Sequence, residues 1–254
     1  MKQYPSDLTD SQWQVIKSIV DNRRKRKYSL RSIVNAILYI TKSGCQWRML
    51  PMNYPPWQSV YYYFNRWKSY GIIEELHDQL VEKVRMKSKK QALPTFGIID
   101  SQSAKAINIC QGEVGYDGGK KTKGRKRHIV VDTLGLILAI VIHPANIHDS
   151  KAAVDVFRAL KEKYVSGIIK IFADGGYRGD ELFDWTKRTM GWVIEVVKRN
   201  ETGNFKVLPK RWIVERTFAW ISFQRRMSKD YERLSETSQA FVQLSMVRVM
   251  LNKF

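Results

Sequence analysis

Apolar residues recur every three to four positions in the first third of the chain, a pattern typical of helices that pack on one face. Thr9 and Gln12 form a capping box, which predicts that a helix begins there. The same spacing predicts a second helix over residues 29–44 and a third over residues 57–70, which Gly71 ends. We therefore expect this part of the chain to be all-helical.

The pattern changes near residues 87–94, where the stretch MKSKKQALP precedes a series of short apolar runs. Helices are expected over residues 150–164 and 179–190, and Pro209 opens a long helix. Five runs predict strands: TFGIID, RKRHIVVD, LILAIVIH, IIKIFAD and WVIEVVK. A meander of strands followed by alternating helices and strands predicts a mixed α/β sheet. We expect two domains, a helical one at residues 1–93 and an α/β one at residues 94–254.

The composition adds a strong positive charge to this picture. The 254 residues include 44 Lys and Arg against 24 Asp and Glu, which gives a formal net charge of +20 and indicates a polyanionic partner. Cys45 and Cys110 lie far apart without a companion His cluster, so a disulfide framework and a structural zinc site are disfavoured and a reducing compartment is favoured. No apolar run reaches the roughly 18–20 residues of a membrane span, so neither export nor a membrane partner is expected.

The helix predicted over residues 57–70 is both aromatic and basic. Three or four short helices that include one of this kind suit a helix-turn-helix-like module, in which the last helix enters the major groove and basic side chains such as Arg66 and Lys68 contact phosphates. Aromatic residues at helical spacing also commonly form a core. A structural role is therefore the alternative for three of them: Tyr61, Tyr62 and Trp67.

Three carboxylates occupy positions from which they could converge. Asp100 and Asp174 each end a predicted strand, and Glu215 lies on the helix that follows Pro209. Because strand carboxyl ends face the crevice of an open α/β sheet, each Asp is either a functional group or the cap of a turn. For Glu215 the alternative is a surface ion pair with Arg211. Three oxygen ligands without a Cys or His cluster suit Mg²⁺ or Mn²⁺, and two such ions could activate a hydroxyl nucleophile.

After the first predicted strand comes a glycine-rich basic segment, GYDGGKKTKGRKRHIVVDTLG, which includes the second predicted strand. Its interleaved glycines and cations would let the backbone follow a nucleic-acid phosphate chain. The segment lacks the GxxxxGK[ST] pattern of a P-loop, so nucleotide hydrolysis has no visible motif. A second basic run, RRKRK at residues 23–27, is expected to be an exposed loop. The candidate DNA contacts in the glycine-rich segment are Lys120, Lys121, Lys123, Arg125, Lys126 and Arg127.

Taken together, these motifs resemble the DDE transposases of bacterial insertion sequences, in the insertion-sequence-five group of the insertion-sequence-four superfamily. The resemblance covers nearly the whole chain. LTDSQWQVI, SGCQWRMLP and WQSVYYYFNRW are similar to the DNA-binding region of the family. IDSQSAK, GYDGGKKTKGRKRHIVVDTLG, PANIHDS, FADGGYRG and RWIVERTFAW are similar to its catalytic blocks.

The resemblance implies a ribonuclease-H-like α/β fold, preceded by an all-α helix-turn-helix-like domain. It also implies that Asp100, Asp174 and Glu215 are a catalytic triad that binds two Mg²⁺ (or Mn²⁺) ions. The implied activity is that of a DNA endonuclease and polynucleotidyl transferase, which cleaves double-stranded DNA at the terminal inverted repeats of its element and joins it to target DNA. A homodimer or higher assembly on DNA is implied, in the bacterial cytoplasm and on the nucleoid when bound.

A family signature, Tyr-x-x-Arg-x-x-x-Glu-x-x-x-x-x-x-Lys, is only half present. Arg211 and Glu215 match it, whereas Leu208 and Ser222 replace its Tyr and Lys. By resemblance, Arg211 contacts a phosphate of the transposon end. The cation missing at position 222 would be supplied by one of two arginines a turn further on, Arg225 or Arg226.

Two other classes of function remain open on the sequence alone. One is a DNA-binding protein without catalysis, such as a repressor of the element. The other is a ribonuclease-H-like nuclease that cleaves without joining. Three further carboxylates near the expected site are given structural roles: Asp132 in a turn, Asp149 as a helix cap and Glu195 on a strand.

Overall fold

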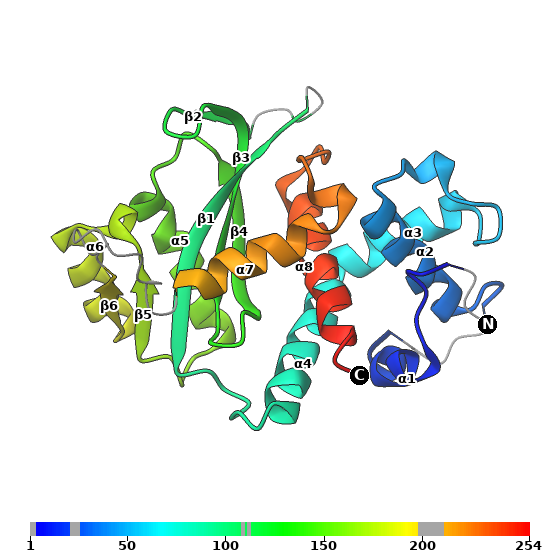
Figure 1. The fold of residues 1–254 in the computed structure, drawn as a ribbon, viewed down its shortest axis with the longest axis horizontal. Helices are drawn as coiled ribbons and strands as arrows, with labels where there is room; N and C mark the ends of the chain where they lie inside the picture. The colour runs from blue at the N-terminus through cyan, green and yellow to red at the C-terminus, as the bar shows by residue number, and fades with distance from the viewer. Residues whose placement is uncertain (1–3, 21–25, 108–109, 111–112, 198–210) are drawn as a thin grey trace. The chain divides into compact units, whose positions relative to one another are not determined.

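The computed structural model describes residues 4–20, 26–107, 110, 113–197 and 211–254, and the chain divides into two compact units (Figure 1). The helical unit comprises Met1–Val84, Trp220–Ser228 and Ala240–Phe254. The sheet unit comprises Arg85–Ala219 and Lys229–Gln239. The sequence predicted a single boundary between residues 93 and 94. The first stretch of the helical unit instead ends at Val84, and two C-terminal segments also belong to this unit.

The helical unit confirms the three helices predicted from periodicity. They are α1 (Asp10–Val20), α2 (Leu30–Ser43) and α3 (Trp57–Ser69), and α4 (Ile72–Lys87) follows α3. The unit also contains two short 3₁₀ turns and the last part of a long C-terminal helix: η1 (Trp47–Met49), η4 (Arg225–Met227) and α8 (Ser235–Leu251). Of the RRKRK run, residues 23–25 lie outside the described part of the chain.

Local chemistry explains where these helices begin and end. The backbone N–H of Thr9 donates to the side chain of Gln12 and the N–H of Gln12 donates to the hydroxyl of Thr9, each at 3.1 Å, which is the predicted capping box. The hydroxyl of Ser29 accepts from the N–H of Ser32 at the start of α2. Gly44 ends α2 at a φ of 70°, a conformation that glycine adopts without strain.

The sheet unit is built around β1 (Phe96–Lys105). This strand pairs antiparallel with β3 (Thr122–Val131) and parallel with β5 (Lys170–Ala173), and β5 pairs parallel with β6 (Val193–Val196). β4 (Ile137–Pro144) pairs antiparallel with β3, and the short β2 (Gly115–Asp117) pairs with the beginning of β3. The order is β2-β3-β1-β5-β6 with β4 beside β3. An antiparallel meander that continues into parallel strands is the ribonuclease-H-like arrangement, so the predicted fold class is confirmed.

Helices cover both faces of this sheet (Figure 1). α5 (Asp149–Lys163) packs on β3 and β4 through a buried stripe that includes Ala153, Val156 and Phe157. On the opposite face runs α7 (Arg211–Ser222), where Thr217 donates to the carbonyl of Gly135 at 2.8 Å in the turn between β3 and β4. Three short helical segments follow β5: η2 (Gly175–Tyr177), α6 (Asp180–Trp185) and the π-helical η3 (Thr186–Met190). In the described ranges no helix is long and apolar enough to cross a membrane.

One predicted strand boundary is wrong in a way that matters for the site. The run TFGIID was expected to end a strand at Asp100, but β1 continues to Lys105 because each residue from Asp100 onward pairs with β3. Asp100 therefore lies inside the central strand. Asp174 does follow the end of β5, as predicted.

Candidate active site

Asp100 lies inside β1, and Asp174 directly follows the neighbouring parallel strand β5. Ile98 pairs with Phe172, so two residues further along each strand the two Asp residues are level. The Asp100 carboxylate accepts the N–H of Ser101 at 2.7 Å, and the Asp174 carboxylate accepts the N–H of Gly176 at 2.8 Å. The sheet topology thus brings together two carboxylates that are 74 positions apart in the sequence.

The electrostatics of this pair are unusual for carboxylates. The pKa of Asp100 is raised to about 6: burial is the largest cause and the negative charge of Asp174 adds to it, while the N–H of Ser101 and the positive charges of Lys120 and Arg211 act against them. A raised pKa means that the ionised pair is short of compensating charge. An added cation would supply that charge, so the two hard-oxygen carboxylates fit a divalent metal ion.

Glu215 is held differently. It lies on α7, half-exposed, and its Oε1 atom is 3.1 Å from Nε of Arg211. The predicted apolar stripe beside it is present, since Val214 is fully buried and Phe218 is 7% exposed. Among the described residues, no three His, Cys, Asp or Glu side chains lie close enough to share a metal ion. The structure therefore brings Asp100 and Asp174 together and leaves Glu215 in the ion pair that the sequence offered as its alternative.

Lys120 belongs to the surroundings of Asp100. It follows the short strand β2, where its N–H donates to the carboxylate of Asp117 at 3.0 Å. Its ammonium donates to the backbone carbonyl of Ser101 at 3.1 Å, and its charge lowers the pKa of Asp100. Lys120 is exposed, as are Lys121 and Lys123 in the same hairpin. These three lysines are placed where a polyanion could reach them.

The next three basic residues of the segment are not exposed to a polyanion. Arg125, Lys126 and Arg127 are buried, with exposures of 0%, 6% and 3%. Arg125 donates to Asp230 and to the carbonyls of Glu232 and Arg233 at 3.3, 2.9 and 2.8 Å. Lys126 donates to Asp149 at 2.7 Å, and Arg127 donates to Gln102 at 3.2 Å. The prediction that these three side chains contact DNA is corrected, because β3 has neighbours on both faces and its cations serve as internal anchors.

Close packing within the sheet unit explains two glycines of the glycine-rich segment, Gly115 and Gly124. A Cβ atom at Gly124 would lie 1.9 Å from the carbonyl oxygen of Ala104 on β1. A Cβ atom at Gly115 would lie 1.9 Å from the side-chain oxygen of Asn146. Both distances are too short for any side chain, so these two glycines allow strands and loops to pack closely rather than a phosphate to approach.

In the helical unit, the two interpretations of the aromatic helix α3 divide by residue. Trp67 is 6% exposed and belongs to the core, whereas Tyr61 and Tyr62 are 41% and 56% exposed. Arg66 donates to the hydroxyl of Tyr62 at 3.1 Å, one turn earlier on the same helix. Lys68, the other basic candidate of α3, is partly exposed. An exposed tyrosine beside a guanidinium is compatible with a nucleic-acid contact.

Of the two arginines expected to replace the signature Lys, Arg225 is exposed and Arg226 is not. Arg226 is 8% exposed, donates to the carbonyl of Cys45 at 3.2 Å, and lies 4.9 Å above the ring of Phe241. A DNA-binding role for Arg226 is therefore corrected, because its guanidinium is committed within the helical unit. Leu208, the other departure from the signature, lies outside the described residues.

The role of one carboxylate near the site differs from the predicted one. Asp149 was expected to cap a helix, but the N-cap of α5 is His148, whose ring nitrogen accepts from Ser150. The Asp149 carboxylate instead accepts from the hydroxyl of Ser101 at 3.0 Å and from Lys126 at 2.7 Å. The β1–β3 pairing accounts for these contacts, because it points Ser101 and Lys126 to the face of the sheet where α5 begins.

The other two spare carboxylates have structural roles. Asp132 accepts from the N–H groups of Leu134 and Leu136 at 2.9 Å each and pairs with Arg85. Glu195 pairs with Lys170 at 2.9 Å across β5 and β6. Both outcomes agree with the predictions.

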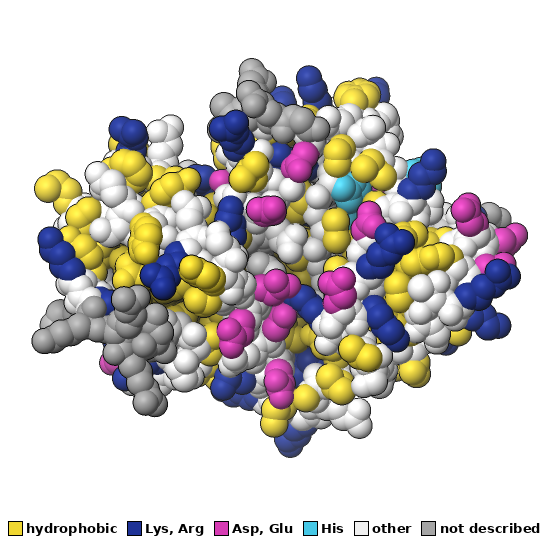
Figure 2. Space-filling view, turned by 180° about the vertical axis from the view of Figure 1, so that it is seen from behind, with side chains coloured by type: hydrophobic (Ala, Val, Ile, Leu, Met, Phe, Trp, Pro, Cys, Tyr) yellow, Lys and Arg dark blue, Asp and Glu magenta, His cyan; other side chains and the backbone are white. Residues whose placement is uncertain are grey.

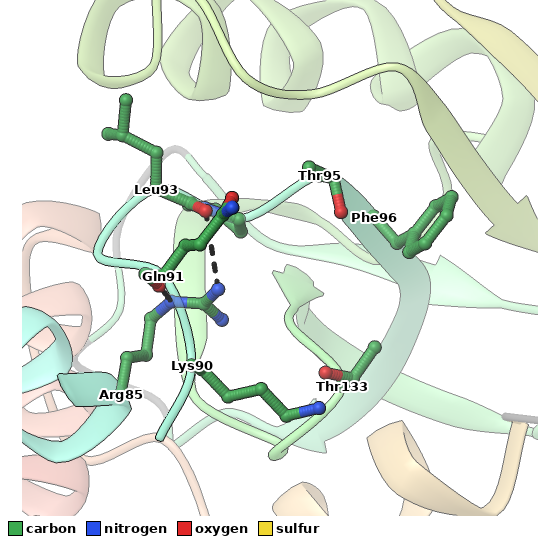
Figure 3. Close-up of a pocket in the computed structure, with 8 residues that line it drawn as sticks. Arg85, Lys90, Gln91, Leu93, Thr95, Phe96 and Thr133 are labelled. Atoms are coloured by element: carbon green, nitrogen blue, oxygen red, sulfur yellow. Dashed lines mark hydrogen bonds between the residues drawn. The ribbon is translucent and has the colours of Figure 1, made fainter. Parts of the chain in front are cut away.

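A pocket of about 340 Å³ lies at the beginning of β1 (Figure 3). Arg85 points at the loop that leads into β1 and donates to the carbonyls of Gln91 and Leu93 at 2.9 and 3.3 Å. Asp100 is absent from its lining, which consists of Arg85, Lys90, Gln91, Leu93, Pro94, Thr95, Phe96 and Thr133. This pocket is therefore separate from the carboxylate pair. On the face shown in Figure 2, Lys and Arg side chains are spread over the surface, and several acidic side chains gather in one group.

Comparison with known proteins agrees with this geometry. Residues 91–250 match the family described as the transposase DDE domain, and residues 8–77 match the family described as putative transposases of the IS4/5 family. The first match covers most of the chain, and the chain belongs to the DDE transposase family. The family matches include both the carboxylate pair and the helical unit's first three helices.

A curated relative is the putative transposase for insertion sequence element IS402 of Burkholderia cepacia. It is 31% identical over 136 residues, which are 51% of this chain and 64% of the relative, so the match spans a little under two thirds of that protein. Two solved structures are similar at a lower level. The Drosophila P element transposase strand transfer complex has 15% identity and a TM-score of 0.36 over 75% of this chain and 45% of its own. The Mos1 strand transfer complex has 12% identity and a TM-score of 0.34 over 99% and 86%.

Proposed function

We propose that this chain is a DNA transposase that binds the terminal inverted repeats of its insertion sequence and catalyses DNA cleavage and strand transfer. The observation that carries the proposal is the pair of Asp100, inside β1, and Asp174, directly after the neighbouring β5, with the pKa of Asp100 raised to about 6. Two such carboxylates with two cations beside them, Lys120 and Arg211, form a site suited to phosphodiester chemistry.

Asp100, Asp174 and Glu215 would be the residues that hold two Mg²⁺ or Mn²⁺ ions. When bound, these ions supply a Lewis acid and lower the pKa of an attacking hydroxyl. The chain's own part is to orient the DNA. Arg211 would bind a phosphate of the transposon end, and the phosphate would compete with Glu215 for the guanidinium. Glu215 would then be released from its ion pair only when DNA is present.

Exposed or partly exposed cations other than Arg211 would also hold the double-stranded DNA. In the sheet unit these are Lys120, Lys121 and Lys123, and in the helical unit they are Arg66, Lys68 and Arg225. Such phosphate contacts give affinity and register without reading sequence. A homodimer or higher assembly on DNA would bring two element ends together.

The test is a strand-transfer assay. The purified protein is incubated with Mg²⁺, a labelled element-end duplex and a supercoiled target plasmid, and wild type is compared with Asp174→Asn and Glu215→Gln. Joined products from wild type alone support the proposal. Nicking without joining would instead favour a nuclease, and end binding with neither reaction in wild type would favour a non-catalytic regulator of the element.

A further inference from the structure

Behind the carboxylate pair, on the α5 face of the sheet, runs a continuous chain of buried hydrogen bonds. The hydroxyl of Tyr177 is 2.7 Å from Nε2 of His128, and Nδ1 of His128 is 3.2 Å from Nε2 of His143. Nδ1 of His143 is 3.0 Å from the carbonyl oxygen of Pro144. Tyr177 and His128 are fully buried and His143 is 8% exposed, so bulk water does not supply alternative partners.

The end of this chain fixes the direction of every bond in it. The carbonyl of Pro144 only accepts, so Nδ1 of His143 carries the hydrogen and its Nε2 accepts. Nδ1 of His128 must then donate to His143, which leaves Nε2 of His128 as an acceptor. The hydroxyl of Tyr177 therefore donates to His128. For neutral rings, this order of bonds places the hydrogen of both histidines on Nδ1.

The surroundings keep the three groups neutral. Burial lowers the pKa of His128 to about 3, with His143, Lys126 and Lys120 adding to the effect against the opposing charge of Asp149. Burial likewise lowers the pKa of His143, against its bond to Pro144 and with Lys126 close by. Burial and the carboxylates of Asp100, Asp149 and Asp174 raise the pKa of Tyr177 well above its usual value. The bond directions deduced above therefore hold around neutral pH.

Tyr177 is also the residue that closes the turn carrying Asp174. Its N–H donates to the carbonyl of Asp174 at 3.2 Å, and the N–H of Gly176 inside the turn donates to the Asp174 carboxylate at 2.8 Å. The negative charges of Asp100, Asp149 and Asp174 act on this phenol. The hydroxyl of the same residue donates to His128, so the end of the turn is tied to β3.

We propose that Tyr177, His128 and His143 are positioning residues for the metal-binding carboxylates. This hydrogen-bonded network anchors the end of the Asp174 turn to β3 and β4, and it thereby fixes where the Asp174 carboxylate lies relative to Asp100. Partners that orient metal-binding groups in this way typically contribute about 10–100-fold to metal affinity or activity. The inference rests on the proposed function, because it takes Asp174 to be a metal ligand.

The first test needs neither DNA nor activity. Two-bond ¹H–¹⁵N correlation spectra of the full chain, labelled with ¹⁵N-histidine, report the tautomer of each ring. We expect His128 and His143 to be neutral with the hydrogen on Nδ1, and the single variants His128→Gln and His143→Gln identify their signals among those of the four histidines. A charged ring, or a His128 ring with its hydrogen on Nε2, overturns the inference.

The second test measures binding of Mn²⁺ by electron paramagnetic resonance of the free ion. Tyr177→Phe and His128→Leu are expected to weaken Asp174-dependent binding by about 10–100-fold. His128→Gln should restore it, because the amide oxygen can accept from Tyr177 and the amide N–H can donate to His143. The matched control is Tyr54→Phe. It removes a buried hydrogen bond from a tyrosine hydroxyl to Asp7 in the helical unit, and at 2.7 Å this bond is as long as the one between Tyr177 and His128.

The outcomes separate this inference from the proposed function. If Tyr177→Phe lowers the stability as Tyr54→Phe does but leaves Mn²⁺ binding unchanged, the three hydrogen-bonded side chains only stabilise the core and the inference is wrong. Absence of Mn²⁺ binding that depends on Asp174 in wild type also overturns it. If Mn²⁺ binding follows the expected order while wild type fails to cleave or join DNA, the proposed function fails and the positioning role stands.

Discussion

Arg211 and Glu215 form an ion pair of 3.1 Å on α7, and the same guanidinium lowers the pKa of Asp100 on β1. One cation therefore influences two of the three proposed catalytic carboxylates. Because Glu215 is half-exposed, a DNA phosphate can compete with it for Arg211 without first entering the core. This arrangement gives the half-present family signature a physical meaning, since its Arg and Glu interact directly.

Replacing Arg211 tests this relationship. Arg211→Gln removes a positive charge near Asp100, so the pKa of Asp100 should rise and cleavage should reach half of its maximum at a higher pH. The salt dependence of end binding should also fall by about 0.9 in the log–log slope, as expected when one phosphate fewer is neutralised. Both are measured with a labelled end duplex across a pH and a salt series.

The control for that variant is Arg188→Gln, which breaks an exposed i,i+4 pair with Asp184, 3.8 Å apart, away from the carboxylates. It should leave the pH profile unchanged. The same profile for wild type and Arg211→Gln would show that the guanidinium does not act on Asp100.

Asp100 should make stability depend on pH in an unusual direction. Its pKa in the folded chain is about 6, above the ordinary value of 3.8, so the folded state binds the proton more tightly than the unfolded state does. The contribution of this group is present below about pH 4 and is lost as the pH rises toward 6. In Asp100→Asn that decline should disappear, which urea denaturation of both proteins at about pH 4.5 and pH 7 would measure.

The same substitution should abolish cleavage and leave end binding nearly intact, because phosphate contacts elsewhere supply most of the affinity. Addition of Mg²⁺ should stabilise wild type more than Asp100→Asn at about pH 7, since a bound cation relieves the repulsion between Asp100 and Asp174. Equal stabilisation of the two proteins by Mg²⁺ would argue against a metal site at this pair.

The sequence predicts much of the fold because its signals are local. The capping box at Thr9, the glycine at position 44 and the apolar spacing of α2 act within a few residues, and each is confirmed. The end of β1 was mispredicted because Asp100 and the polar residues after it have no apolar signal of their own. They are held in the strand by pairing with β3, a partner that local pattern does not reveal.

The same limit explains the basic segment. Charge and glycine content cannot distinguish a DNA-facing loop from a strand buried on both faces. What decides is the alternation in β3, where Arg125 and Arg127 point to one face and Lys126 and His128 to the other. The acceptors that satisfy these cations come from residues up to 108 positions away, so only the folded chain shows that they are internal.

The exposed lysines of the hairpin are expected to bind DNA rather than to stabilise the fold. Lys121→Ala with Lys123→Ala should weaken DNA binding and reduce its log–log salt slope by up to about 0.9 for each phosphate that is no longer neutralised. The folded state should change little, because both side chains are exposed. The measurement is end binding across a salt series together with urea denaturation, and an unchanged slope would remove these lysines from the DNA path.

Arg125 gives the sharpest distinction between a structural and a DNA-binding cation. Arg125→Met should lower the free energy of unfolding by about 3–5 kcal/mol, because the carboxylate of Asp230, itself 2% exposed, would lose its buried ion pair with Arg125. Arg158→Met is the control, since it breaks an exposed pair with Asp155 at 3.2 Å and should change the free energy of unfolding by less than about 1 kcal/mol. Urea denaturation of both variants decides the matter. A weaker and less salt-dependent DNA binding of Arg125→Met at unchanged stability would mean that this guanidinium reaches DNA after all.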